Sequence, residues 1–546
     1  MFIMSFFQVA HKIGEEQIKI WDESSSARNS VEMLHSGNYL FATIDGKPDY
    51  YDVKPPLQLW LKVMSFKVFG INEFAVRVPT LISYFLLTLL LFFFANIYLK
   101  NSNIGIILVI LPAISYGFVN YHMAWHGDTD ILLTLFTTSY LLLAFVFLEE
   151  FPKHRLGYVI LLSFLVSTAY FTKSIAGIAP AIGIVIYALI KRRKVFTSYV
   201  SYLPVVIFIL SLVIYYFVVD LYAPGYFKSI INNHLMPFKE YPTAPKHPEF
   251  SFYFNYLLNT GFYPFSYWLP IIIIPLIFSK NKQLKNFLIY LLITSSAFLI
   301  GQSSALMKNE WYIAPIYPLL WLIIAVSIYE TSSVIKARLF PKSKAFVILY
   351  YALLISGLYV SAHGYHKVLD HNINRSSSYI YTPERDGEFL NSIFIWNPNI
   401  NNIFILKKKT DFSDRQLDFY IKKFRYFNNK NIQIIRKTGD EIIDKYVLCT
   451  VPTLIRQLQA EYETMTIYKE HYGSLLYIRG DKLSHETDMG EKMNPELINK
   501  ITNDFLNDKK TLPNKIKLAT RQGHDLEVIL WKEAVRKIKN DSVLIE

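Results

Sequence analysis

The sequence contains one cysteine, Cys449, in 546 residues. A single thiol excludes an intrachain disulfide framework and any zinc site built from cysteine ligands. The chain is also poor in charge: only 18% of its residues are Asp, Glu, Lys or Arg, against roughly 25% in soluble globular domains. No GxGxxG, Walker A or zinc-finger pattern occurs, so nothing in the sequence points to a nucleotide site.

Apolar residues are abundant instead. Hydrophobic residues make up 52% of the chain, aromatic residues make up 16%, and the mean hydropathy is positive. This composition excludes disordered, collagen-like and coiled-coil chains and favours a membrane protein. The net charge of +13 would suggest nucleic acid as a partner in a soluble protein. Here the basic residues lie between apolar runs, where membrane topology explains many of them, and we expect a lipid bilayer and no nucleic acid as partner.

Ten apolar runs have about the 17 to 25 residues needed to cross hydrocarbon. They are residues 80–99, 104–122, 130–148, 156–172, 174–190, 199–219, 263–279, 286–306, 312–330 and 345–362. Five short segments on one side of these runs carry 14 Lys and Arg, whereas the turns around Asp128, Lys173 and Lys308 on the other side carry two. The basic loops should face the cytoplasm. We therefore predict a multi-pass protein of the cytoplasmic (inner) membrane with residues 22–79, 220–262 and everything after 363 outside.

Four regions follow from this topology. Residues 1–21 hold too many ionisable side chains to span the membrane, so we expect most of a first helix to lie upstream of Met1. Residues 1–79 should then contain the remnant of that helix and a first outer loop with interfacial helices. Residues 80–362 form the bundle of about ten helices. In 363–483, β-rich runs such as 402–406 alternate with amphipathic stretches such as 413–427, which predicts an extracytoplasmic α/β domain. Residues 484–546 read as a polar helical tail.

The first outer loop holds two acids and a lysine that could carry chemistry. Asp22 and Glu23 open a predicted helix that runs through Leu34. Acids at a helix start have an ordinary explanation as caps that complement the helix dipole. Alternatively, one carboxylate above the bilayer serves as general base for an acceptor hydroxyl. Lys54 lies beside two prolines at the start of an interfacial helix, where it either snorkels or meets a lipid phosphate.

Further ionisable residues lie in the turns assigned to the same side. Asp128 and Asp130 either cap the following helix, bind a metal or orient a sugar hydroxyl. Lys173 runs against the charge trend and therefore needs a partner, for which a phosphate or a carboxylate would each suffice. Lys308 lies just before Trp311 and opens the last such turn.

The order of these motifs resembles that of the polyprenyl-phosphate-dependent GT-C glycosyltransferases, relatives of protein O-mannosyltransferases and of lipid A aminoarabinose transferase. The matching motifs of the first loop are Trp21-Asp22-Glu23-Ser24, Gly46-Lys47-Pro48, Lys54-Pro55-Pro56-Leu57, Trp60-Leu61, Phe69-Gly70 and Glu73-Phe74-Ala75-Val76-Arg77-Val78-Pro79. The later ones are Asp130-Ile131-Leu132-Leu133, Thr172-Lys173, and Lys308 through Trp311-Tyr312, Pro315 and Pro318. The resemblance extends from residue 20 to about residue 330, and its specificity lies in the combination.

The resemblance implies a GT-C-like helical bundle, a polyprenyl-phosphate-linked sugar as donor and an acceptor hydroxyl of a lipid, glycan or protein. The implied catalytic acids are Asp22, with Glu23 beside it, and Asp130. The cations expected to meet the donor phosphate are Lys54, Lys173 and Lys308, and the residues expected to bind substrate are Asp128, Trp311 and Tyr312. The expected reaction is a single displacement at the anomeric carbon with inversion.

Metal use is the point at which the sequence departs from the family pattern. In the aminoarabinose branch a Glu precedes the lysine as a metal ligand, whereas Val53 stands here and Asp52 lies one residue earlier. If a divalent metal ion is used, the candidate ligands are Asp52, His234 and His247, although the two histidines have no standard metal spacing. Two other functions also fit a polytopic chain: a lipid-linked sugar flippase or other transporter, and an envelope scaffold. A transporter would more often show internal repeats and ionisable residues at mid-membrane.

Overall fold

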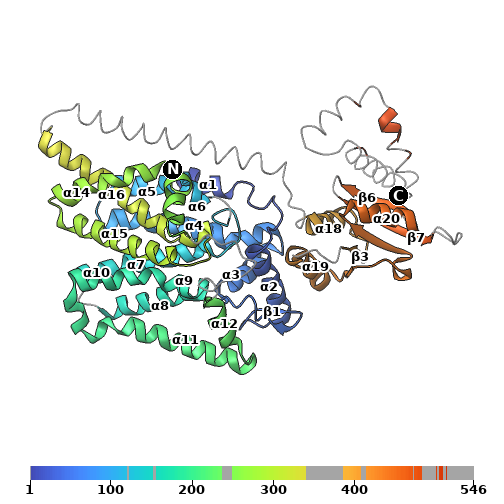
Figure 1. Ribbon diagram of the computed structural model, residues 1–546, viewed down its shortest axis with the longest axis horizontal. Coiled ribbons are helices and arrows are strands. Elements are labelled where there is room, and N and C mark those ends of the chain that lie inside the picture. Colours follow the sequence, from blue (N-terminus) through green and yellow to red (C-terminus); the bar gives the residue numbers. More distant parts are fainter. Residues whose placement is uncertain are drawn as a thin grey trace. The chain divides into compact units, whose positions relative to one another are not determined.

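A computed structural model of the chain divides into two compact units (Figure 1). The bundle unit consists of Met1–Glu16 and Asn29–His371, and the sheet unit consists of Gln17–Arg28 and Asn372–Glu546. The structure describes residues 2–119, 122–151, 155–235, 249–339, 385–407, 414–470 and 473–481, together with short pieces between 500 and 530. Helix α2 (Asp22–Ser36) contributes residues to both units.

Six helices among the described residues are long and apolar enough to cross a membrane. They are α4 (Glu73–Phe93) continued by η1 (Phe94–Tyr98), α7 (Asp130–Glu150), α8 (Arg155–Lys173), α11 (Leu203–Tyr222) preceded by η4 (Tyr199–Ser201), α15 (Lys282–Ser303) and α16 (Ile316–Leu339). A seventh candidate is a helical pair, Phe252–Gly261 and Phe265–Phe278, bent by 113°. These helices confirm the predicted multi-pass helical fold.

Not every predicted run forms a straight span, and prolines account for the differences. The run 104–122 gives a shorter helix, α5 (Ser102–Ile114), which contains Pro112 and is followed by α6 (Tyr116–Val119). The run 174–190 is divided into α9 (Ile175–Ile178), η2 (Ala179–Ala181) and α10 (Ile182–Lys191), with Pro180 at the division. The run 263–279 forms the second half of the bent pair, and the break between the two halves contains Pro264. The run 345–362 lies outside the described residues.

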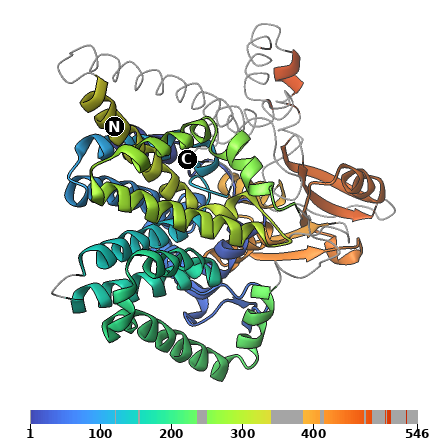
Figure 2. The ribbon, with the colours of Figure 1, turned by 60° about the vertical axis from the view of Figure 1, so that its left-hand side comes forward.

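The helices of the bundle unit pack in a connected series. Helix α4 contacts α5 and α7, α7 contacts α8, and α8 contacts α11. Helix α15 contacts α10 and α16, and Figure 2 shows α15 and α16 side by side. The approach of α10 to α15 depends on Gly183, because a Cβ added there would lie 2.4 Å from the Cα of Thr294. Small residues permit such close helix contacts in membranes.

A carboxylate ties three of these elements together at one end of the bundle. Glu149, near the end of α7, accepts hydrogen bonds from the Tyr187 hydroxyl of α10 (2.5 Å) and the Asn286 amide of α15 (3.1 Å). The Arg192 guanidinium, just after α10, also binds this carboxylate. Multiple donors to one acidic group satisfy a charge that would otherwise be costly in a largely buried position.

Between α2 and α4 the chain forms a hairpin and a short helix that is apolar on its exposed face as well. Strands β1 (Thr43–Ile44) and β2 (Lys47–Pro48) pair antiparallel around Asp45 and Gly46, whose φ angles are 51° and 77°. An Asp-Gly turn favours this geometry, and the Glu32 carboxylate accepts both turn N–H groups, at 3.0 and 2.7 Å. Helix α3 (Leu57–Phe69) then buries Leu59, Val63 and Phe66 and exposes Met64, Val68 and Phe69.

The sheet unit contains a mixed five-stranded sheet in the order β4-β3-β5-β7-β6 (Figure 1). Its strands are β3 (Asn402–Leu406), β4 (Asn431–Ile435), β5 (Lys445–Cys449), β6 (Tyr462–Glu470) and β7 (Gly473–Asp481). Strand β3 pairs parallel with β4 and β5, and β7 pairs antiparallel with β5 and β6. The helices are α18 (Arg385–Trp396), α19 (Arg415–Asn428) and α20 (Pro452–Glu461). The predicted C-terminal α/β domain is thus confirmed, whereas most of the predicted polar tail lies outside the described residues.

Candidate functional site

Two predicted site residues meet where α7 begins and α8 ends. The Lys173 amine lies 2.6 Å from Asp130 Oδ1, and the two side chains are 13% and 1% exposed. Helices α7 and α8 are joined by a short connection and run antiparallel, so the last residue of α8 lies beside the first residue of α7. Of the two partners expected for Lys173, a phosphate or a carboxylate, the structure shows a carboxylate. Asp130 Oδ2 is buried and has no hydrogen-bond partner among the described residues. One oxygen of this buried carboxylate therefore keeps its hydrogen-bonding capacity unused among the described residues.

Asp128 lies two residues earlier and pairs with a histidine. His122 Nδ1 lies 2.9 Å from Asp128 Oδ2, and both side chains are nearly inaccessible to solvent. The turn that carries Asp128 is fixed by two neighbouring helices. The Gln58 amide of α3 donates to the Gly127 carbonyl at 2.6 Å, and the Thr80 hydroxyl of α4 donates to the Asp128 carbonyl at 3.3 Å.

The predicted aromatic pair lies against the Asp130–Lys173 ion pair and the Asp128–His122 pair. Trp311 and Tyr312 belong to η8 (Glu310–Ile313). The ring of Trp311 stacks on His122 with centroids 3.8 Å apart and planes inclined by 16°. The Lys173 amine lies 5.4 Å from the centroid of the Tyr312 ring, within range of a cation–π interaction. Trp311 thus packs on the His122–Asp128 pair, and Tyr312 lies beside the Lys173–Asp130 pair.

We call this group the Asp130 cluster. Its members are Asp128, Asp130, Lys173, His122, Trp311 and Tyr312. Five of them were expected from the sequence, and His122 was not. The motif that drew attention to this turn begins at residue 126, and a lone histidine four residues upstream carries no spacing that would mark it.

Lys54 lies just before α3 and is the most accessible of the three predicted phosphate-binding lysines. Its amine lies 3.4 Å from Asp52 Oδ1, and its side chain is 34% exposed. The preceding turn is held by Asp49, whose Oδ1 accepts the N–H groups of Tyr51 and Asp52 at 2.9 and 3.0 Å. A partly exposed amine on a fixed turn is suited to binding an anion.

Lys308 is deeply buried by contrast. Its side chain is 2% exposed, and its amine donates to the Ala305 carbonyl. Burial lowers the pKa of Lys308, and the charge of Glu249 opposes this effect. The hydrogen bond to Ala305 therefore fixes the position of the Lys308 amine.

Asp22 and Glu23 begin α2 and belong to the sheet unit. Glu23 is 1% exposed, and its carboxylate accepts the backbone N–H of Lys19 at 2.7 Å. This bond closes a tight turn in which Trp21 has a φ of 74°. Glu23 therefore organises the local backbone, whereas Asp22 is only partly buried.

No group of three or more His, Cys, Asp or Glu side chains that could hold a metal ion occurs in the part of the chain that the structure describes. Of the candidate ligands, Asp52 faces Lys54. His247 lies outside the described residues, and only the backbone of His234, within α12 (Tyr226–Leu235), is described.

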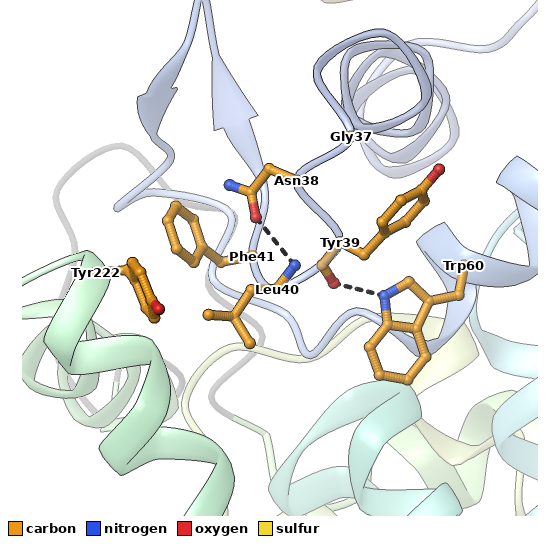
Figure 3. Close-up of a pocket in the computed structure, with 7 residues that line it drawn as sticks. All are labelled: Gly37, Asn38, Tyr39, Leu40, Phe41, Trp60 and Tyr222. Atoms are coloured by element: carbon orange, nitrogen blue, oxygen red, sulfur yellow. Dashed lines mark hydrogen bonds between the residues drawn. The ribbon is translucent and has the colours of Figure 1, made fainter.

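The bundle unit also contains an open pocket of about 570 Å³ between α3 and α11 (Figure 3). It is lined by Gly37, Asn38, Tyr39, Leu40, Phe41, Trp60 and Tyr222. The Trp60 indole N–H donates to the Tyr39 carbonyl at 2.7 Å, so the polar atom of this ring is satisfied within the wall. A mainly aromatic and aliphatic lining suits the hydrocarbon part of a ligand.

Comparison with known proteins relates this architecture to glycosyltransferases. A family model for dolichyl-phosphate-mannose-protein mannosyltransferases matches residues 53–217. An undecaprenyl phosphate-alpha-4-amino-4-deoxy-L-arabinose arabinosyl transferase of Pseudomonas savastanoi pv. phaseolicola is 31% identical over 182 residues, which are 33% of each chain. An uncharacterized protein of Aquifex aeolicus is 23% identical over 356 residues, 65% of this chain and 67% of that protein.

A solved structure extends the likeness to the whole fold. The crystal structure of ArnT from Cupriavidus metallidurans bound to undecaprenyl phosphate matches 89% of this chain and 98% of its own, with a TM-score of 0.62 and 16% identity. The chain spans only about a third of the length of the Pseudomonas arabinosyl transferase in sequence, but the fold match includes the larger part of both units. The chain thus shares its fold with ArnT, and part of its sequence is similar to dolichyl-phosphate-mannose-protein mannosyltransferases and to arabinosyl transferases, which supports a place among the GT-C glycosyltransferases.

Proposed function

We propose that this protein moves a sugar from a polyprenyl-phosphate donor to a hydroxyl acceptor at the outer face of the cytoplasmic membrane. The observation that carries the proposal is the Asp130 cluster, in which buried carboxylates, a lysine and a histidine gather at helix ends. Ionisable groups at such positions in membrane bundles mark functional sites. Two comparisons support the donor class, because related proteins are named for undecaprenyl phosphate sugars or bind undecaprenyl phosphate.

In the proposed reaction, Asp22 takes the proton of the acceptor hydroxyl as that oxygen bonds to the anomeric carbon. The bond between the anomeric carbon and the phosphate oxygen breaks, and the configuration inverts. The departing polyprenyl phosphate carries the negative charge, which Lys54 stabilises. The acceptor is a lipid, glycan or protein hydroxyl, and the sugar is a pentose or a hexose.

The environments of the three lysines support different roles for them. Lys173 and Lys308 are largely buried and engage Asp130 and the Ala305 carbonyl, respectively. Lys54 is the most exposed, and we assign it the donor phosphate. In this proposal Asp130 Oδ2 accepts a hydrogen bond from a sugar hydroxyl. The apolar pocket beside Trp60 is suited to a lipid chain.

The first prediction concerns Asp22. Asn caps a helix about as well as Asp, so Asp22→Asn should fold normally and bind donor, but it should transfer sugar on the order of a hundredfold more slowly. The measurement uses purified protein in proteoliposomes with a radiolabelled polyprenyl-phosphate sugar. Asp45→Asn, an acid-to-amide change in the hairpin turn of the same loop, is the control and should keep full activity. Undiminished transfer by Asp22→Asn would reduce Asp22 to a helix cap.

The second prediction concerns Lys54. Lys54→Met keeps most of the aliphatic stem and removes the charge, so the affinity for polyprenyl phosphate should fall by about tenfold or more, the value of a hydrogen bond to a charged group. Equilibrium binding of labelled polyprenyl phosphate measures this loss. Lys67→Met, at an exposed position of α3, is the control and should bind as the parent protein does. Equal affinity in both variants would show that Lys54 merely snorkels.

The third prediction separates structure from chemistry in the Asp130–Lys173 pair. Either Asp130→Asn or Lys173→Met alone leaves a buried charge without its partner and should lower the free energy of unfolding by about 3 to 5 kcal/mol. The double variant removes both charges and should recover most of that loss in thermal melting. Glu150→Gln, at the exposed end of α7, should change stability by less than about 0.5 kcal/mol. A stable double variant with full transfer activity would show that the pair has no part in the reaction.

The fourth prediction concerns orientation, which the charge asymmetry of the loops supports. In a Cys449→Ala background, a cysteine at Ser484 should react with an impermeant maleimide in intact spheroplasts. A cysteine at Thr197, in a basic loop, should react only after permeabilisation. The opposite pattern would place the segment after residue 363 in the cytoplasm.

Covalent transfer of labelled sugar, rather than its movement across the bilayer, distinguishes the enzyme from a transporter.

A further inference from the structure

The segment that carries Asp22 is hydrogen-bonded to helix α19 of the C-terminal domain. Although Gln17–Arg28 lies near the start of the chain, it groups with the sheet unit. The Arg415 guanidinium donates to the Ser25 hydroxyl at 2.9 Å, across 390 residues of sequence. The Ile18 N–H donates to the Tyr420 hydroxyl at 3.4 Å, across 402 residues. Both partners belong to α19.

These two contacts lie on either side of Asp22. Ile18 precedes it by four residues, and Ser25 follows it by three, which is about one turn of α2. Between them, the Glu23 carboxylate holds the Lys19 N–H, and the Ser25 N–H donates to the Trp21 carbonyl at 2.9 Å. The turn around Asp22 is thus closed internally and attached at both ends to α19.

Helix α19 is itself fixed to the sheet at its first residues. Asp414, immediately before α19, binds the Lys407 amine at 2.5 Å and the Arg436 guanidinium at 3.3 Å. Lys407 and Arg436 directly follow strands β3 and β4. The Lys407 amine also lies 2.9 Å from Asp386 of α18. Arg415, the next residue after Asp414, therefore extends from a point held by two parallel strands.

We propose that α19 is a clamp that sets the position of Asp22, with Arg415 as its positioning residue. This inference rests on the proposed role of Asp22 as the base. The C-terminal domain then takes part in the reaction indirectly, because it fixes the backbone from which the base reaches the acceptor hydroxyl. A small displacement of a catalytic group is enough to cost a large factor in rate.

Arg415→Gln removes the charged donor from the full-length protein and should lower kcat for sugar transfer by about tenfold or more, with donor affinity unchanged. Arg415→Lys retains a cation and should recover part of the rate. The matched control is Arg425→Gln on the same helix, whose guanidinium donates to the Ile432 carbonyl inside the sheet unit. It should leave kcat near the parent value. An unchanged kcat in Arg415→Gln, measured beside an impaired Asp22→Asn, would overturn the clamp.

Hydrogen exchange provides a readout that does not depend on activity. Peptides that cover residues 17–28 should exchange about tenfold faster in Arg415→Gln, because one anchor of the segment is lost. Peptides from β5 and β7 should exchange as in the parent protein. Ser25→Ala removes the same hydrogen bond from the other side and gives the same result if Arg415→Gln fails to fold. Unchanged exchange at 17–28 in the folded variant refutes the clamp, whereas full transfer activity in Asp22→Asn refutes only the role assigned to Asp22.

Discussion

Two opposite charges lie buried where α7 begins and α8 ends, and neither could remain ionised there alone. The separation of 2.6 Å between Asp130 and Lys173 offsets the cost of removing both from water. This requirement fixes the ends of two membrane helices against each other. A second polar pair is buried nearby: His122 lies 2.9 Å from Asp128 and stacks on Trp311, so η8 packs against a pair from a different part of the chain. The arrangement of this end of the bundle follows from the need to neutralise a small number of ions.

Much of the fold could be predicted because its signals are local. Run length and hydropathy locate the long helices, and the β-rich run 402–406 coincides with β3. The predictions were less accurate where backbone chemistry interrupts an apolar run. Pro112, Pro180 and Pro264 leave hydropathy high but lie where the helix ends, divides or bends, so a count of apolar runs overestimates the number of straight spans.

In the candidate site, too, features with a local signal were predictable and features that depend on tertiary packing were not. Residue type and position in a turn were enough to select Asp128, Asp130, Lys173, Trp311 and Tyr312. Their pairing was not predictable, because Asp130 and Lys173 are 43 residues apart and meet only through antiparallel packing of α7 and α8. His122 was missed, since its role arises from a stacking partner almost two hundred residues later in the chain. The bond from Arg415 to Ser25 joins the two ends of the sequence and carries no local signal at all.

The Glu149 carboxylate holds three helices of the bundle together at one end. Helix α7 has 21 residues and is therefore roughly 30 Å long, so Glu149 and Asp130 lie at opposite ends of it. At the Glu149 end, Tyr187, Arg192 and Asn286 bind one carboxylate and join α7, α10 and α15. Separating those helix ends would leave a largely buried charge without its donors. The ends of α7, α10 and α15 are thus held to one another through a single carboxylate, about one membrane thickness away from the Asp130 cluster.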